Sequence, residues 1–284
     1  MRGSGFLFAP AYVSVLAFAT MVPAAAQVPS DGLVAYYPLS GDAHDAGPAG
    51  YDGVNHGAIA TADRFGAPGG ALRFDGRSAY LEIPDRNGFS IAATGAFTIS
   101  IWMRPDTLNF AKPESEGYVH WMGKGVPGQH EWVLRMYGRE TDRPNRMSCY
   151  AYNLAGGLGS GSFVQEEVTP SAWVHLVARY DFPANDIRIY KNGKKTDQDF
   201  FTDYAVIPAN GTAPVRIGTR DFGSWFQGAV DDARFYSRAL SDAEITALYA
   251  EKHAGVAVER PRGHAVAFAQ RPGRRTVDGK LHRP

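Results

Sequence analysis

Short runs of alternating apolar and polar residues, separated by turn residues, cover the chain from about residue 32 to 228. The runs are rich in β-branched and aromatic residues, and Gly, Pro, Asn and Asp stand between them. This pattern is typical of an all-β sandwich or barrel. The expected strands are 33–39, 71–74, 79–83, 97–103, 131–137, 173–180, 187–190, 215–217 and 226–236. Their number suits two packed sheets.

Local signals add a hairpin and a helix. Asn192-Gly193 follows the strand 187–190, and Asn-Gly is the strongest two-residue hairpin signal because both positions tolerate positive φ. A helix is expected from Ser241 to about Lys252, where Ser241 can cap the first turn and Glu244 occupies the capping-box position. Strands therefore make up the rest of the predicted domain, 31–252.

The N-terminal end has the features of a signal peptide. Arg2 precedes an apolar stretch from Phe6 to Met21, and residues 24–26 are three small alanines suited to cleavage. The apolar run is shorter than the roughly 20 residues that a membrane-spanning helix needs, which disfavours an anchor. We expect residues 1–26 to be removed, no transmembrane segment, and a secreted or periplasmic location.

The C-terminal part, 255–284, loses periodicity and carries seven Lys and Arg residues against two acidic ones. We expect a disordered tail there, and a basic anchor to acidic polysaccharide or cell-surface phosphate is the alternative. The whole chain has a formal net charge of +0, so no global field draws it to nucleic acid or to an anionic membrane. A partner must be selected by a local surface.

The chain has a single cysteine, Cys149, so an intramolecular disulfide is excluded. It lies in the alternating run 146–152, which indicates a packed strand cysteine rather than a nucleophile.

Three segments together resemble a known family. They are Gly32-Leu-Val-Ala-Tyr-Tyr-Pro-Leu39, Ala71-Leu-Arg-Phe-Asp-Gly-Arg-Ser-Ala-Tyr-Leu-Glu-Ile83 and Gly228-Ala-Val-Asp-Asp-Ala-Arg-Phe-Tyr-Ser-Arg-Ala-Leu-Ser-Asp-Ala-Glu-Ile245. The chain from about Asp31 to Lys252 resembles the laminin G-like branch of the concanavalin A-like lectin and glucanase superfamily. The resemblance implies a jelly-roll sandwich of two antiparallel sheets, one of them concave. Members often bind sugars or proteins, many hold calcium, and some are enzymes.

The Gly-rich loop 40–53 resembles the acidic loop that follows the first strand in this family. Calcium takes six to eight oxygen ligands, and such loops supply carboxylates and carbonyls. The resemblance implies a structural calcium ion held by Asp42, Asp45 and Asp231.

Alternation along 226–236 places Asp231 on the same side as Ala233 and Phe235, so its carboxylate is expected to point inward and to need a partner. The alternative to calcium is a site without metal. In that case Asp231 and Asp75 accept hydrogen bonds from turn amides or pair with Arg73 or Arg234.

Aromatic and planar polar residues gather in the middle of the sequence. Aromatic rings stack on the apolar faces of sugars, and planar polar groups fix hydroxyls. Alternation in 131–137 separates Trp132, for which core packing is expected, from Arg135 and Tyr137 on the other face. The candidate carbohydrate-binding residues are His120, Trp121, His130, Arg135, Tyr137, Tyr150 and Tyr152. The glycine stretch 155–162 is interpreted as a mobile hairpin tip.

No catalytic residues are assigned. The Glu-x-Asp-x-x-Glu arrangement of the superfamily's glucanases is absent from the sequence, and Glu166-Glu167 are adjacent, so they face opposite sides of a strand. A polysaccharide lyase would need a Tyr or His base with an Arg or Gln that neutralises a uronate, and Gln129, His120, His130, Arg135 and Tyr150 offer such groups. We therefore expect a secreted carbohydrate-binding or adhesion module with a calcium-stabilised sandwich. The alternatives are a lyase acting on uronate-containing glycans and a protein-binding structural sandwich.

Overall fold

The computed structural model describes residues 27–110 and 117–251, which form two antiparallel sheets. The strands of the first sheet are β1 (Leu33–Tyr37), β3 (Ile59–Thr61), β4 (Ala71–Asp75), β6 (Ala96–Pro105), β11 (Val174–Asp181), β12 (Asp186–Lys191), β13 (Lys194–Asp199) and β15 (Gln227–Tyr236). They are hydrogen-bonded in the order β13-β12-β11-β6-β15-β4-β3, and β1 also pairs with β15.

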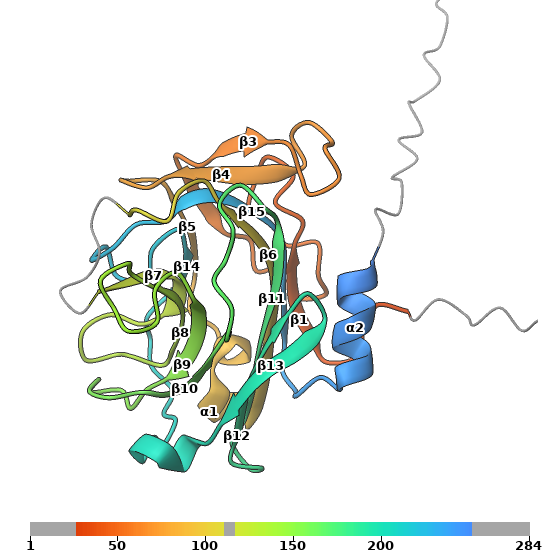
Figure 1. Cartoon of the computed structure of the whole chain (residues 1–284). Helices are drawn as coiled ribbons and strands as arrows, with labels where there is room; N and C mark the ends of the chain where they lie inside the picture. The colour runs from red at the N-terminus through yellow and green to blue at the C-terminus, as the bar shows by residue number, and fades with distance from the viewer. Residues whose placement is uncertain (1–26, 111–116, 252–284) are drawn as a thin grey trace, which may run out of the picture. The chain divides into compact units, whose positions relative to one another are not determined.

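The second sheet has seven strands within the described residues. They are β2 (Val54–His56), β5 (Tyr80–Ile83), β7 (Tyr118–Lys124), β8 (Trp132–Tyr137), β9 (Met147–Ala151), β10 (Ser160–Phe163) and β14 (Val215–Ile217). Their order is β10-β9-β8-β7-β14-β5-β2. In Figure 1 the strands β7 to β10 lie on one side of β6 and β11, and α2 (Asp242–Ala250) lies on the other. The predicted sandwich is confirmed.

Little helix accompanies the strands. Besides α2 there are the one-turn helix α1 (Ile91–Thr94) and the 3-10 turns η1 (Asn87–Phe89) and η2 (Phe201–Tyr204) in the described part of the chain. The predicted C-terminal helix is confirmed as α2, and its N-cap Ser241 accepts a hydrogen bond from the amide of Glu244. The Asn-Gly hairpin is also confirmed: Asn192 and Gly193, between β12 and β13, have φ of 51° and 76°.

The facing sides of the two sheets make the main core. The apolar face predicted for β6 is fully buried there and consists of Phe97, Ile99, Ile101 and Met103. Trp132 of β8 meets it, with its ring centroid 5.6 Å from that of Phe97. Complete burial of a side chain of this size stabilises the fold by about 1.5–3 kcal/mol. Cys149 is buried in the same core, and burial raises the pKa of its thiol to about 12.

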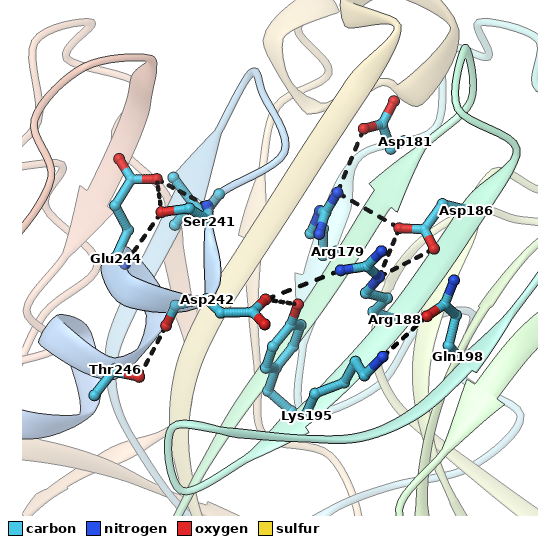
Figure 2. A network of polar contacts seen from close by, with 12 residues as sticks. Arg179, Asp181, Asp186, Arg188, Lys195, Gln198, Ser241, Asp242, Glu244 and Thr246 are labelled. Carbon is cyan, nitrogen blue, oxygen red and sulfur yellow. Dashed lines mark hydrogen bonds and ion pairs between the residues drawn. The ribbon is translucent and has the colours of Figure 1, made fainter.

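Helix α2 covers the outer face of the eight-stranded sheet. Ile245 and Leu248 pack with Val177, Tyr190 and Tyr236, whose strands turn these side chains away from the main core. Figure 2 shows the polar contacts at this place, where the carboxylate of Asp242 approaches Arg188. The hydroxyl of Tyr190 also donates to Asp242 at 2.7 Å. Apolar and polar contacts together fix the helix on this sheet.

A β-bulge in β15 overturns one prediction. Pairing with β6 shifts between Asp231 and Arg234, and Asp232 has a left-handed φ of 47°. The extra residue turns Asp231 away from the core side, where Val230 and Ala233 lie. Strict alternation would place Asp231 and Ala233 on the same face of the strand. Because of the bulge, they lie on opposite faces.

Residues 1–26, predicted to be a signal peptide, and residues 255–284, predicted to be a disordered basic tail, lie outside the described residues. Within the described ranges, no helix has the length and apolar character needed to cross a bilayer.

Candidate functional site

A pocket opens on the outer face of the seven-stranded sheet, over β7, β8 and β9. Alternation along β8 sends Trp132, Leu134 and Met136 into the core, so Arg135 and Tyr137 point outward, as predicted. The cavity has a volume of about 420 Å³. Its lining consists of Tyr118, His120, His130, Arg135, Tyr137, Asp142, Arg143, Tyr150, Tyr152, the loop 156–159, Tyr204 and Arg220.

Arg135 lies in the wall of the pocket between tyrosine rings. Its guanidinium carbon is 3.9 Å from the ring centroid of Tyr118 and 3.6 Å from that of Tyr150. Its Nε donates to Ser148 Oγ at 3.2 Å. Burial alone would lower the pKa of Arg135, but the phenols of Tyr152, Tyr150 and other tyrosines hold it above its ordinary value. The pocket thus contains a rigidly held, charged planar donor.

Two phenols join this wall to the β8–β9 loop. The hydroxyls of Tyr137 and Tyr150 are 2.9 Å apart. Arg143 Nη1 donates to the Tyr137 hydroxyl at 3.1 Å, and its guanidinium lies 4.1 Å from the Phe163 ring centroid. The pKa of Tyr150 is raised, first by burial and also by its hydrogen bond with Tyr137. The Tyr150 phenol therefore stays neutral, and the paired hydroxyls of Tyr137 and Tyr150 can be offered to a ligand.

The segment 219–225 brings a third arginine to the pocket. The hydroxyl of Thr219 donates to the carbonyl of Ser224 at 2.7 Å, and the amide of His120 donates to Ser224 Oγ at 2.9 Å. Arg220 pairs with Asp221 at 2.6 Å. Burial, followed by the charges of Arg220 and Arg135, lowers the pKa of His120 well below its ordinary value. His120 is therefore a neutral imidazole near neutral pH.

Glycines let two tyrosine rings lie close to β10. A Cβ at Gly161 would overlap the Cys149 carbonyl and come within 2.5 Å of Tyr150 Cγ. A Cβ at Gly159 would lie 2.6 Å from Tyr152 Cε1. This glycine stretch was predicted only to be a mobile hairpin tip, whereas residues 156–159 line the pocket and the glycines make room for its rings.

The structure brings together six of the seven residues predicted to bind carbohydrate. His120, His130, Arg135, Tyr137, Tyr150 and Tyr152 all line the pocket. Trp121 is 0% exposed and packs against Phe226 in the core, with ring centroids 5.6 Å apart. Adjacent strand residues face opposite sides, and a register shift between His120 and Met122 leaves Trp121 on the core side. The expectation that Trp121 contacts a ligand is therefore corrected.

The predicted calcium ligands have protein partners instead. Asp45 accepts hydrogen bonds from the amides of Tyr36, Gly47 and Tyr51 at 2.7–2.8 Å. Asp42 is exposed and accepts from the amide of His44 at 3.0 Å. Among the described residues, no group of three or more His, Cys, Asp or Glu side chains could hold a metal ion. Calcium stays a prediction, but these carboxylates do not fit its ligand set.

The metal-free alternative named Asp75 and Asp231, and the structure gives both of them protein partners. Asp75 accepts from the amides of Arg77, Ser78 and Ala79, each at 2.9 Å, as that alternative expected. Asp231 pairs with Arg64 at 2.8 Å rather than with Arg73 or Arg234. Sequence spacing did not reveal Arg64, because the β-bulge and a contact across 167 residues create this pair.

Comparison with known proteins identifies the class of the chain. A family model described as the concanavalin A-like lectin/glucanases superfamily matches residues 75–246, which is more than half of the chain. The protein belongs to this family, as the sequence predicted. No curated protein matches the sequence.

Solved structures share the fold at low identity. Domain 4 of AbnA, a GH43 extracellular arabinanase from Geobacillus stearothermophilus, was solved in complex with arabinotriose; it is 17% identical, with a TM-score of 0.57 over 76% of this chain and 98% of that one. The binding domain of Paraclostridial Mosquitocidal Protein 1 is 16% identical, with a TM-score of 0.56 over 78% of this chain. The receptor binding domain of a botulinum neurotoxin C/D mosaic serotype is 10% identical, with a TM-score of 0.58 over 78%. The chain spans 52% of each of these two toxin domains.

Several pocket residues were not predicted from the sequence. Arg143 and Asp142 belong to the charged turn between β8 and β9, Tyr204 to η2, and Arg220 to the segment after β14. The turn 139–146 carries three arginines beside an aromatic strand, which was a usable signal for Arg143. No local pattern points to Arg220, because long-range strand pairing places it beside β7.

Proposed function

We propose that this protein is a carbohydrate-binding module whose pocket over β7, β8 and β9 receives a sugar unit of a glycan. The observation that carries the proposal is the arrangement around Arg135, where a charged planar donor and the Tyr137–Tyr150 hydroxyl pair stand among aromatic rings in one cavity. Rings that pack on apolar sugar faces, together with a few fixed polar groups, are the usual elements of such sites. The arabinotriose complex of a domain with the same fold supports the proposal.

The module is proposed to act outside the cytoplasm. The features of residues 1–26 that are typical of a signal peptide support this location, and the arabinanase that shares the fold is described as extracellular.

Binding is favoured over lyase chemistry by the electrostatics of the pocket. A general base works best with a pKa near the operating pH. The pKa of Tyr150 is raised by burial, which disfavours its phenolate, and the pKa of His120 is lowered by burial and the nearby arginines, which weakens it as a base. Both pKa shifts move these residues away from the near-neutral pKa that a proton-abstracting base needs. Incubation with uronate polymers is therefore expected to give no rise in ultraviolet absorbance from an unsaturated product.

Affinity measurements on Tyr204→Ala test the proposal. Tyr204 is 53% exposed at the rim of the pocket, so its removal takes away a stacking surface with little effect on the core. We expect affinity electrophoresis and calorimetry on a panel of plant and microbial polysaccharides to identify a ligand, which the variant binds about five- to tenfold more weakly.

Tyr249→Ala is the matched control, since Tyr249 is 40% exposed but lies on α2, over the other sheet. Absence of retention on every polysaccharide, or equal weakening by both variants, would contradict a glycan site in this pocket.

A further inference from the structure

Arg135 is a buried charge that has no carboxylate partner in the described ranges 27–110 and 117–251. The residue is 7% exposed, and its polar partner is the hydroxyl of Ser148. Among the residues that the structure describes, no acidic side chain forms an ion pair with it, whereas Arg220 in the same pocket pairs with Asp221. Removing a charge from water is costly unless it is paired. The tyrosine rings offset part of this cost through cation–π contacts.

The remaining charges of the lining are also mainly positive. Arg135, Arg143 and Arg220 contribute three guanidinium groups, and Asp142 is the acidic residue of the lining. The pKa of His120 is lowered by burial and then by Arg220 and Arg135, so these charges act across the pocket. Asp221 compensates Arg220, so a neutral sugar would leave chiefly the buried charge of Arg135 without an anionic partner.

We propose that the pocket selects an acidic sugar unit, whose carboxylate or sulfate is held by Arg135, with Arg143 at the rim. The inference rests on the proposed glycan-binding function and adds the substrate class. A guanidinium matches the planar geometry of a carboxylate and also accommodates the oxygens of a sulfate. The neighbouring Tyr137 and Tyr150 hydroxyls are placed to contact the ring hydroxyls of the same sugar.

Calorimetry with matched oligosaccharides tests this class. One pair is oligogalacturonate and its fully methyl-esterified form, and a second pair is a sulfated galactan oligosaccharide and its desulfated form. We expect the full chain to bind the acidic member of at least one pair about tenfold more tightly than the neutral member. The preference is expected to shrink as NaCl is raised, because salt screens the charges. The two pairs distinguish a carboxylate from a sulfate.

Two substitutions locate the preference in the pocket. Arg135→Gln is expected to abolish it, and circular dichroism checks that this variant is folded. Arg143→Gln, at the rim, is expected to reduce the preference several-fold and keeps the inference testable if the first variant does not fold. Arg179→Gln is the control, because Arg179 lies outside the pocket and contacts Asp181 and Asp186 (Figure 2).

The outcomes separate the two proposals. Equal binding of acidic and neutral members, or an acidic preference unchanged in Arg143→Gln and in folded Arg135→Gln, would overturn the inference and leave the glycan-binding proposal standing. Failure to bind any of a broad set of neutral and acidic glycans would overturn both.

Discussion

His175 and Arg135 show that this fold buries ionisable side chains in opposite charge states. Arg135 stays charged among tyrosine phenols in the pocket. His175, on β11 under α2, is 1% exposed and lies 2.9 Å from the hydroxyl of Ser100. Trp102 and Tyr249 stack near it, with ring centroids 5.0 and 6.0 Å away. Burial, followed by the charges of Arg64 and Arg234, lowers the pKa of His175 to about 3.

The depressed pKa of His175 predicts acid sensitivity. Between pH 6.5 and about 3 the unfolded chain binds a proton at this residue that the folded chain does not, so the free energy of unfolding falls as the pH is lowered. At the acid end of this pH range, the depressed pKa of His175 lowers the free energy of unfolding by roughly 4–5 kcal/mol. Urea unfolding at a series of pH values is expected to show a weaker pH dependence for His175→Gln than for the wild type.

The exposed His56 of β2 provides the control, as His56→Gln. The interpretation fails if His175→Gln and the wild type have the same slope of unfolding free energy against pH.

Helix α2 depends on the cap at its first turn. Glu244 accepts from the amide of Ser241 at 2.8 Å and pairs with Arg238 at 2.5 Å. Arg238 in turn donates to the carbonyl of Asp31 at 2.9 Å, which ties the start of the domain to its end. The hydrogen bond from Arg238 is the main reason that the pKa of Glu244 is lowered to about 2. One carboxylate therefore both caps the helix and anchors it.

Glu244→Gln is expected to destabilise the domain in a pH-dependent way. The carboxylate stabilises the fold fully above the unfolded pKa of 4.5, and this contribution is lost as the pH falls towards about 2. Because the side chain is partly exposed, we expect a loss of about 1 kcal/mol or less at pH 7 and no difference from the wild type near pH 2. Tryptophan fluorescence during urea unfolding measures this loss of stability, since Trp102 stacks on Tyr249 of α2 with ring centroids 5.7 Å apart.

The exposed Glu140, changed to Gln, is the matched control. A deficit in Glu244→Gln that is unchanged at pH 2 would argue that the carboxylate charge is not what stabilises the helix.

The sequence predicted the elements whose side chains alternate strongly and missed those whose side chains do not. β6, β8 and β11 have buried apolar faces that the period of two reveals. β2 and β3 are three residues long, so backbone pairing at a sheet edge defines them instead. β13 is polar and its side chains are partly exposed, so the Asn-Gly hairpin signal predicts it rather than alternation.

The same limit applies to the candidate site. Arg135, Tyr137 and Tyr150 lie on strands, so alternation predicts the face they share. Trp121 and Asp231 each lie at or beside a β-bulge, where alternation fails. Arg220 reaches the pocket through pairing of β14 with β7, which no local pattern encodes.

For the whole molecule, the two sheets have different roles. The outer face of the eight-stranded sheet is covered by α2, and the outer face of the seven-stranded sheet carries the pocket. The loop after β1 is fixed to the rest of the domain by Asp45, whose carboxylate accepts three backbone amides. Hydrogen bonds within the protein thus hold this loop, and the calcium ion predicted for it stays a prediction.

Chelation and substitution at this loop check that conclusion. We expect EDTA to leave the thermal unfolding midpoint unchanged, and Asp45→Asn to lower it by roughly 4–8 °C, because a buried carboxylate that accepts several amides is worth about 2 kcal/mol. Asp42→Asn, at an exposed acid of the same loop that accepts a single amide, is the control and should change it less. A fall of several degrees in the thermal unfolding midpoint with EDTA would support a bound calcium ion, held by ligands other than Asp42 and Asp45.

The position of Cys149 has a practical consequence. It is the one thiol of the chain, it is sealed between the sheets, and its high pKa leaves almost no thiolate at neutral pH. Thiol-directed reagents and disulfides therefore have no reactive thiolate to attack while the protein is folded. A cysteine introduced at the rim of the pocket would be the one reactive thiol of the folded chain, so a fluorophore or spin label could be attached there without first removing the native residue.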